Sequence, residues 1–221
     1  MSVIKRIQYN SPVILTYALV SLIVCGINYL TIGVSNHLFF SIYRSSPADP
    51  LTYVRLFAHI LGHADINHYF SNFLLVLLVG PMLEEKYGSV PMLIMMLITA
   101  VVTGAIFLLV SSNTALLGAS GIVFMLILLS SFVNFKRGRV PLTLVLVIIA
   151  YIGNEAYQGF TASDNISHLT HIIGGLCGAV AGYFINSARI NSEAKHVDPE
   201  ESLPAAPAES QAVETAKAEE N

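Results

Sequence analysis

The chain has 221 residues, of which 11% are charged and 54% are hydrophobic. A soluble globular domain carries about 25% charged residues, so this composition excludes an ordinary soluble domain and favours a lipid bilayer as the surroundings. The net charge of −3 comes from the C-terminal end, since eight acidic residues and two lysines follow from Glu193 onward. The rest of the chain is mildly basic, but no patch is basic enough to predict nucleic acid as a partner.

Three stretches contain no Asp, Glu, Lys or Arg at all: residues 7–43, 87–135 and 165–188. A membrane-spanning helix needs about 20 apolar residues, so the long middle stretch predicts two spans with an uncharged connection. We predict helices rather than strands, because a helix satisfies its own backbone in lipid. In chain order the predicted spans are 12–34, 67–85, 90–110, 117–135, 140–158 and 168–187. The expected fold is therefore an all-α membrane protein, a bundle of six transmembrane helices.

The basic residues predict the orientation of this bundle. With a cytoplasmic N-terminus, nine of the eleven Lys and Arg residues lie on the cytoplasmic side and only Arg44 and Arg55 lie outside. Both termini of this multi-pass membrane protein are therefore expected in the cytoplasm. Six spans without a seventh predict a bacterial plasma membrane as its location. The expected domains are a cytoplasmic segment 1–11, a membrane domain 12–187 and a disordered acidic cytoplasmic tail 188–221, which is rich in Glu, Ala, Pro and Ser.

The longest predicted connection runs from residue 35 to residue 67. It is too apolar to be simply solvated, since it holds many large hydrophobic side chains, among them Phe39, Phe40, Tyr43, Leu51, Tyr53, Leu56, Phe57, Ile60 and Leu61. A loop at membrane depth must pack, because its backbone groups would otherwise stay unpaired. We therefore expect this loop to lie in the interface, or partly within the membrane against the helices.

Polar side chains inside apolar spans are costly, so each is a functional hypothesis. The first group is Gly118-Ala119-Ser120-Gly121, where a polar loop ends and the fourth predicted span begins. The first turn of a helix offers free N–H groups and a partial positive charge, which favour an alkoxide on Ser120 and an oxyanion beside it. The alternative is a packing seam of small residues with a serine helix cap.

The second group lies in the sixth predicted span. His171, Gly174, Gly178 and Gly182 stand at i, i+3, i+7 and i+11, so they share one stripe of a helix. A glycine stripe lets another helix approach closely. If that helix is the fourth span, His171 can act as the general base for Ser120. His168 lies near the same face, and the alternative for either histidine is a packed side chain bonded to a backbone carbonyl.

The third group is His68 and Asn72 in the second predicted span. They are four residues apart and therefore lie on one helical face. Both side chains can donate hydrogen bonds, to each other or to a developing negative oxygen. The alternative is an ordinary hydrogen bond between helices, which is worth about 0.6–2 kcal/mol. Together the three groups supply a nucleophile, a base and oxyanion donors from three different spans.

At these residues the chain resembles the rhomboid family of intramembrane serine proteases. The likeness rests on His68 with Asn72, on Gly118-Ala119-Ser120-Gly121, and on His171 with Gly174 and Gly178. The stretch from Gly80 to Gly88 and the long first loop with Arg55 also fit the family. The resemblance covers roughly residues 12–187 and implies the rhomboid-like six-helix bundle.

The resemblance also implies roles for these residues. Ser120 is the nucleophile and His171 the base, and His68, Asn72 and the backbone N–H of Ser120 support the oxyanion. Phe124 stands where the best-known members have a tyrosine whose ring stacks on the base, so the stacking is kept and the hydroxyl is lost. Val54 replaces the tryptophan that often precedes the loop arginine.

The implied activity is hydrolysis of peptide bonds in or near the transmembrane segments of other membrane proteins, with no metal or cofactor. The main alternative is a membrane transporter or metal-binding protein that uses an imidazole cluster of His59, His63, His68, His168 and His171. A third possibility is a rhomboid-like binding protein without catalysis. Against it stands the intact Ser120 and His171 pair. Substrate transmembrane segments and bilayer lipid are the expected partners, and the sequence does not predict an oligomeric state.

Overall fold

The computed structural model of the protein describes residues 8–111, 114–133, 139, 142–147, 149–150 and 165–195. By its internal contacts the chain divides into two units, Met1–Asn186 and Ser187–Asn221. The first unit contains all of the described helices and strands except the end of the last helix.

The described residues are mostly helical, as the sequence predicts. The long helices are α1 (Pro12–Leu30), α3 (Ile66–Tyr87), α4 (Ser89–Val110) and α8 (Asn165–Lys195). The first three, and residues 168–188 of α8, are long and apolar enough to cross a membrane. They correspond to the first, second, third and sixth predicted spans, which are confirmed in this respect.

The fourth predicted span, 117–135, is wrong in its extent. The helix found there, α5, runs only from Ser120 to Ser130. Its eleven residues rise about 16 Å, roughly half of the hydrocarbon thickness. Every side chain from Ile122 to Leu129 is buried. A helix that is apolar all round belongs in the middle of a protein, and α5 accordingly has other helices on its sides.

The last two predicted spans are described to different extents. Helix α6 (Leu142–Val147) is the described part of the fifth predicted span, most of which lies outside the described residues. Helix α8 continues to Lys195, beyond the predicted end at 187, because no proline or glycine interrupts the chain between Gly182 and Pro199. Residues 188–195 of the predicted tail are thus helical, and the remainder of that tail lies outside the described residues.

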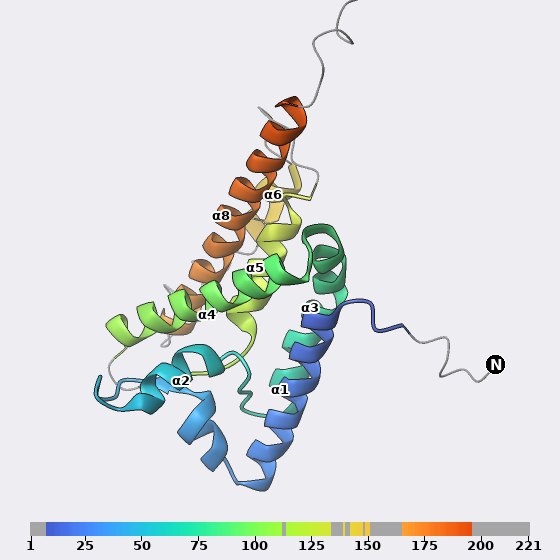
Figure 1. Ribbon diagram of the computed structural model, residues 1–221. Helices are drawn as coiled ribbons and strands as arrows, with labels where there is room; N and C mark the ends of the chain where they lie inside the picture. Colours follow the sequence, from blue (N-terminus) through green and yellow to red (C-terminus); the bar gives the residue numbers. More distant parts are fainter. Residues whose placement is uncertain are drawn as a thin grey trace, which may run out of the picture. The chain divides into compact units, whose positions relative to one another are not determined.

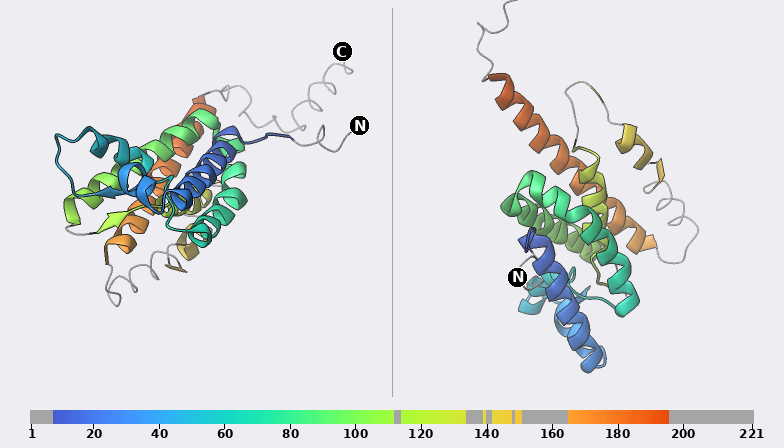
Figure 2. Two further views of the ribbon diagram at one scale, coloured as in Figure 1. Left: turned by 90° about the horizontal axis from the view of Figure 1, so that it is seen from below. Right: turned by 90° about the vertical axis from the view of Figure 1, so that its right-hand side faces the viewer.

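Helices α3 and α4 both pack against α5, and α1 packs against α3 (Figure 1). The part of α8 up to Asn186 lies beside α5, as two views agree (Figure 2). Helix α5 is thus enclosed by the longer helices, which explains why its side chains are buried although it is short.

The first loop is a folded structure of its own. It contains a π-helical turn η2 (Asn36–Phe40), strand β1 (Ile42–Tyr43) and helix α2 (Pro50–Ala58). Helix α2 packs against α4, so the prediction that this loop packs on the helices is confirmed. Strand β1 pairs antiparallel with β2 (Ala115–Leu116), which directly precedes α5.

Arg55 holds the first loop together from inside. Its side chain is 3% exposed and forms an ion pair with Asp49 at 3.1 Å. Its Nε donates to the Leu38 carbonyl at 2.9 Å, and its guanidinium lies 4.6 Å from the centre of the Tyr43 ring. One cation therefore joins η2, β1 and the N-cap of α2.

Glu84 joins the end of α3 to the beginning of α1. Its carboxylate is buried and accepts hydrogen bonds from the backbone N–H groups of Val13 (3.0 Å) and Ile14 (2.9 Å). The Ser89 hydroxyl also donates to this carboxylate, at 2.7 Å. A negative charge at the N-terminus of α1 satisfies donors that the helix itself leaves unpaired.

Replacing Glu84 by glutamine is expected to lower the free energy of unfolding by about 1–3 kcal/mol, because an amide offers one acceptor oxygen where two are used. Unfolding in mixed detergent micelles measures this loss. The control is Glu85→Gln on the exposed side of the same turn. Equal stabilities of the two variants would refute the capping role of Glu84.

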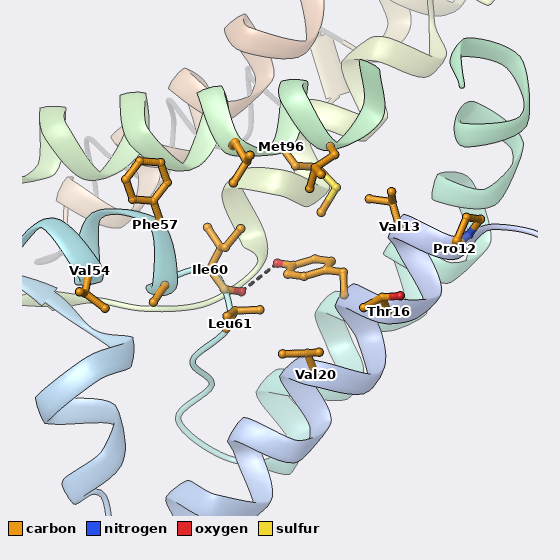
Figure 3. Close-up of a pocket in the computed structure, with 13 residues that line it drawn as sticks. Pro12, Val13, Thr16, Val20, Val54, Phe57, Ile60, Leu61 and Met96 are labelled. Atoms are coloured by element: carbon orange, nitrogen blue, oxygen red, sulfur yellow. Dashed lines mark hydrogen bonds between the residues drawn. The ribbon is translucent and has the colours of Figure 1, made fainter. Parts of the chain in front are cut away.

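An apolar cavity of about 660 Å³ lies between α1, the end of α2 and α4 (Figure 3). On one side of it the Tyr17 hydroxyl donates to the Ile60 carbonyl at 2.8 Å. None of the residues that line this cavity is a predicted site residue. The candidate site lies elsewhere, at the N-terminus of α5.

Candidate active site

The local sequence around Gly118 places Ser120 at the start of α5. Gly118 has φ +124°, a conformation that L side chains rarely adopt, so the helix cannot begin before it. Ala119 is the N-cap, and its carbonyl accepts from the Val123 N–H at 2.9 Å. Ser120 is therefore in the first turn, where the N–H groups have no partner within the helix.

The glycine stripe of α8 meets α5 backbone to backbone. A Cβ on Gly174 would collide with the carbonyl group of Gly121, whose Cα would lie 2.9 Å from it. A Cβ on Gly178 would likewise collide with the carbonyl group of Met125. The predicted close approach of these two helices is therefore present, and it starts one residue after Ser120.

His171 contacts α5 at Phe124, four residues after Ser120, the first residue of that helix. Its imidazole stacks on the Phe124 ring, with 4.8 Å between the ring centres and 9° between the planes. Phe124 is four residues after Ser120, so both side chains project from the same face of the helix. The stacking that the family resemblance implied for Phe124 is present. The imidazole of His168 lies edge-on to that of His171, at 6.2 Å between ring centres.

His68 reaches the same place from α3. Its ring covers Gly118, where a Cβ would lie 2.8 Å from Cε1 and 2.9 Å from Nε2. Its Nδ1 accepts from the Ala64 N–H at 3.5 Å. The proton of the neutral ring therefore sits on Nε2. This nitrogen faces residues 117–120, which we call the serine loop.

Asn72 is buried one turn further along α3. Its amide Nδ2 donates to the His68 backbone carbonyl at 3.0 Å rather than to the His68 ring. An amide nitrogen carries two hydrogens, so one N–H remains for another acceptor. His68, Ser120 and His171 are each half-buried, so reagents can reach them.

Sequence reasoning missed how the first loop contacts the serine loop. The backbone N–H of Gly118 donates to the His59 carbonyl at 2.9 Å, and that of Ala119 donates to His63 Nε2 at 3.4 Å. The positions of His59 and His63 shortly before His68 and Asn72 do not reveal these contacts, because a histidine can equally bind a metal ion or a backbone group. From the sequence these two histidines entered only the metal-site alternative.

Among the residues that the structure describes, no group of three or more His, Cys, Asp or Glu side chains is arranged to hold a metal ion. His63 and His68 lie together, at 5.1 Å between ring centres. His59 is turned away from them, with Nδ1 facing the Arg55 and Leu56 carbonyls at 3.2 Å each. His59 therefore contacts different groups from His63 and His68, although all three suggested the metal-site alternative.

Burial lowers the pKa of both loop histidines to about 4. For His63 the nearby His68 lowers the pKa further. The unfolded chain protonates these imidazoles near pH 6.5, so between about pH 6.5 and 4 the unfolded state binds more protons. The stability that comes from the neutral imidazoles is therefore complete above pH 6.5 and declines as the pH falls toward 4.

We expect this decline to be on the order of 3 kcal/mol for each histidine. Unfolding in detergent at neutral and acidic pH measures it, with His59→Phe as the test variant and His37→Phe, at an exposed position of the same loop, as the control. The acid sensitivity should shrink in the first variant only. If all three proteins lose equal stability on acidification, burial of neutral His59 does not contribute.

Residues 50–188, which are more than half of the chain, match the Rhomboid domain. The chain belongs to the rhomboid family. Rhomboid-related protein 1 of Caenorhabditis elegans is 29% identical over 146 residues, which are 59% of this chain and 39% of the relative. Rhomboid-like protein 11, chloroplastic, of Arabidopsis thaliana is 25% identical over 150 residues, which are 60% of this chain and 54% of the relative.

The match confirms the resemblance that the motifs indicated. It covers all four predicted site residues of the rhomboid domain, His68, Asn72, Ser120 and His171, whereas α1 lies before it. With four candidate membrane spans, the rhomboid domain indicates a multi-pass membrane protein. The chain spans about half or less of the length of these two relatives.

Proposed function

We propose that this rhomboid domain is an intramembrane serine protease that hydrolyses peptide bonds in or near transmembrane segments of other proteins. Ser120 is the nucleophile and His171 the general base. The observation that carries the proposal is the position of the His171 ring, stacked on Phe124 at the helix face that Ser120 begins. A serine and an imidazole brought to one face by two tightly packed helices are the minimum set for acyl transfer.

The reaction follows the usual two steps of a serine hydrolase. Ser120 Oγ attacks the carbonyl carbon of the scissile peptide while His171 takes the hydroxyl proton. His171 then gives this proton to the leaving amine, and an ester on Ser120 remains. Water attacks the ester, His171 takes the proton of the water, and the bond to Ser120 Oγ breaks as that oxygen regains a proton.

The oxyanion of both tetrahedral intermediates needs donors. The backbone N–H of Ser120 is in the first turn of α5, where the helix dipole adds a partial positive charge. His68 Nε2–H faces this loop, and Asn72 supplies a second side-chain donor from the same helix. We expect His68→Ala or Asn72→Ala to lower turnover by about 10- to 1000-fold, less than loss of the nucleophile.

The short α5 supports a site below the membrane surface. A helix of eleven residues is about half as long as the hydrocarbon core is thick, and we infer that its Ser120 end lies within that core. We infer the six-helix bundle with both termini in the cytoplasm, a position in a bacterial plasma membrane, and a site that opens to the outer side. The substrate segment must unwind there to expose a carbonyl, which small residues or proline near the cut facilitate.

The test is cleavage of a transmembrane substrate reconstituted with the protein in liposomes. The wild type should cleave it, and Ser120→Ala should not. Ser130→Ala is the matched control, since Ser130 ends the same helix and its hydroxyl donates to the Ile127 carbonyl of that helix at 2.6 Å. Cleavage by Ser120→Ala at the wild-type rate would reject the proposal.

A further inference from the structure

The segment His59–His63 is fixed from several sides. The Ile60 carbonyl accepts from Tyr17 in α1 at 2.8 Å, and the His63 carbonyl accepts from Asn36 Nδ2 in η2, also at 2.8 Å. The His59 carbonyl accepts from the N–H of Gly118. Helix α1, the first loop and the serine loop therefore hold this segment in one position (Figure 3 shows the Tyr17 bond).

His63 is the one side chain of this segment that bonds to the serine loop. Its ring is fully buried, with the rings of Tyr69 and Phe73 at 5.5 Å between centres. Since Nε2 accepts from the Ala119 N–H, the ring proton is on Nδ1, which donates to the Leu61 carbonyl at 3.2 Å. Both nitrogens are thus used, and the ring is neutral.

The peptide that His63 holds has little orientation of its own. It joins Gly118, which lacks a Cβ to restrict it, to Ala119, whose side chain cannot cap the helix. The next peptide along the chain carries the N–H of Ser120. Only the backbone torsions of Ala119, φ −79° and ψ 0°, separate the two peptides, so the orientation of the first peptide influences the direction of the N–H that is proposed to meet the oxyanion.

We propose that His63 is a positioning residue, whose neutral imidazole accepts from the Ala119 N–H and thereby aims the Ser120 N–H at the oxyanion. This inference rests on the proposed protease function. His63 does not touch the reacting atoms. Its effect is on the transition state, because the donor it aims is strengthened when negative charge develops.

The test compares His63→Gln with His63→Met. The two side chains have the same length, but glutamine offers a carbonyl oxygen as acceptor, whereas the methionine thioether accepts only weakly. In the His63→Met variant we expect kcat to fall by about 10- to 100-fold with KM changed by less than about twofold, which is the pattern of a lost transition-state interaction. The His63→Gln variant should lose at most about half as much kcat as His63→Met on a logarithmic scale. His37→Phe is the control and should match the wild type.

A second readout is the rate at which a fluorophosphonate inactivates each folded variant, since this reagent forms a tetrahedral adduct on serine without needing a transmembrane substrate. It should fall in parallel with kcat. If the His63→Met variant does not unfold cooperatively, His63→Phe replaces it in the comparison with His63→Gln. Equal kcat and equal inactivation rates in the acceptor and apolar variants would overturn the positioning role.

The two proposals fail differently. If Ser120→Ala still cleaves substrate, the protease assignment fails. If Ser120→Ala is inactive and the His63→Gln and His63→Met variants match each other, only the role of His63 fails. A KM increase without a kcat change in the apolar variant would also contradict it, because that pattern reports lost substrate binding.

Discussion

His171→Ala is expected to reduce cleavage of a membrane substrate by about a thousandfold or more, since the proposed general base for Ser120 is then missing. The expected pattern is a loss of kcat with little change in KM, because the imidazole acts in the transition state. Initial rates in liposomes over a range of substrate densities measure both constants. Thermal unfolding of the same samples shows whether the fold survives the loss of the ring stacked on Phe124.

His168→Ala is the matched control for this experiment. His168 lies one turn before His171 on α8, with its ring edge-on to that of His171. It should retain activity within about tenfold of the wild type, as a neighbour of the base rather than the base. A fully active His171→Ala protein beside an inactive His168→Ala protein would show that the base is misassigned.

Gly178→Leu is expected to have the largest effect on folding. Its Cβ would lie 2.8 Å and 2.9 Å from the carbonyl carbon and Cα of Met125, both backbone atoms that cannot move without shifting α5. Helix association in a membrane depends on such close contact of small residues, so we expect a loss of about 3 kcal/mol or more. Because the same helix contact positions His171 against Phe124, four residues after Ser120, we expect the proposed activity to be lost as well.

Gly26→Leu supplies the comparison. Gly26 lies in α1, another candidate membrane span, and a Cβ there would meet nothing within 4 Å. The same substitution should therefore change stability by less than about 1 kcal/mol. Similar losses for the two variants in mixed-micelle unfolding would mean that leucine is harmful in any of these helices and that the α5–α8 contact is not special.

The sequence predicts most of the long helices because uncharged stretches are long relative to the bilayer. It also predicts the contact of α8 with α5, since glycines at i+3 and i+7 from His171 have few other uses in a membrane helix. Phe124 was placed on His171 through the family resemblance. These features depend on local composition and spacing, which a sequence displays directly.

What could not be predicted depends on contacts between distant segments. The early end of α5 follows from its central position, which hydropathy does not reveal. The contacts of His59 and His63 with the serine loop cross more than 50 residues of chain, and a histidine gives no sign of whether it bonds to metal or to backbone. The extension of α8 to Lys195 was hidden because residues 188–195 are mostly polar and charged, with one large apolar side chain, which suits both an exposed helix end and a disordered tail.

The most direct test of the central claim is to treat the protein with a fluorophosphonate, digest it and locate the adduct by mass spectrometry. A reactive hydroxyl at the start of α5, activated from α8, predicts one adduct, on Ser120. It also predicts that His171→Ala is labelled far more slowly. Absence of labelling in a folded, cleaving wild type, or an adduct on another serine, or an unchanged labelling rate in His171→Ala, would contradict the account.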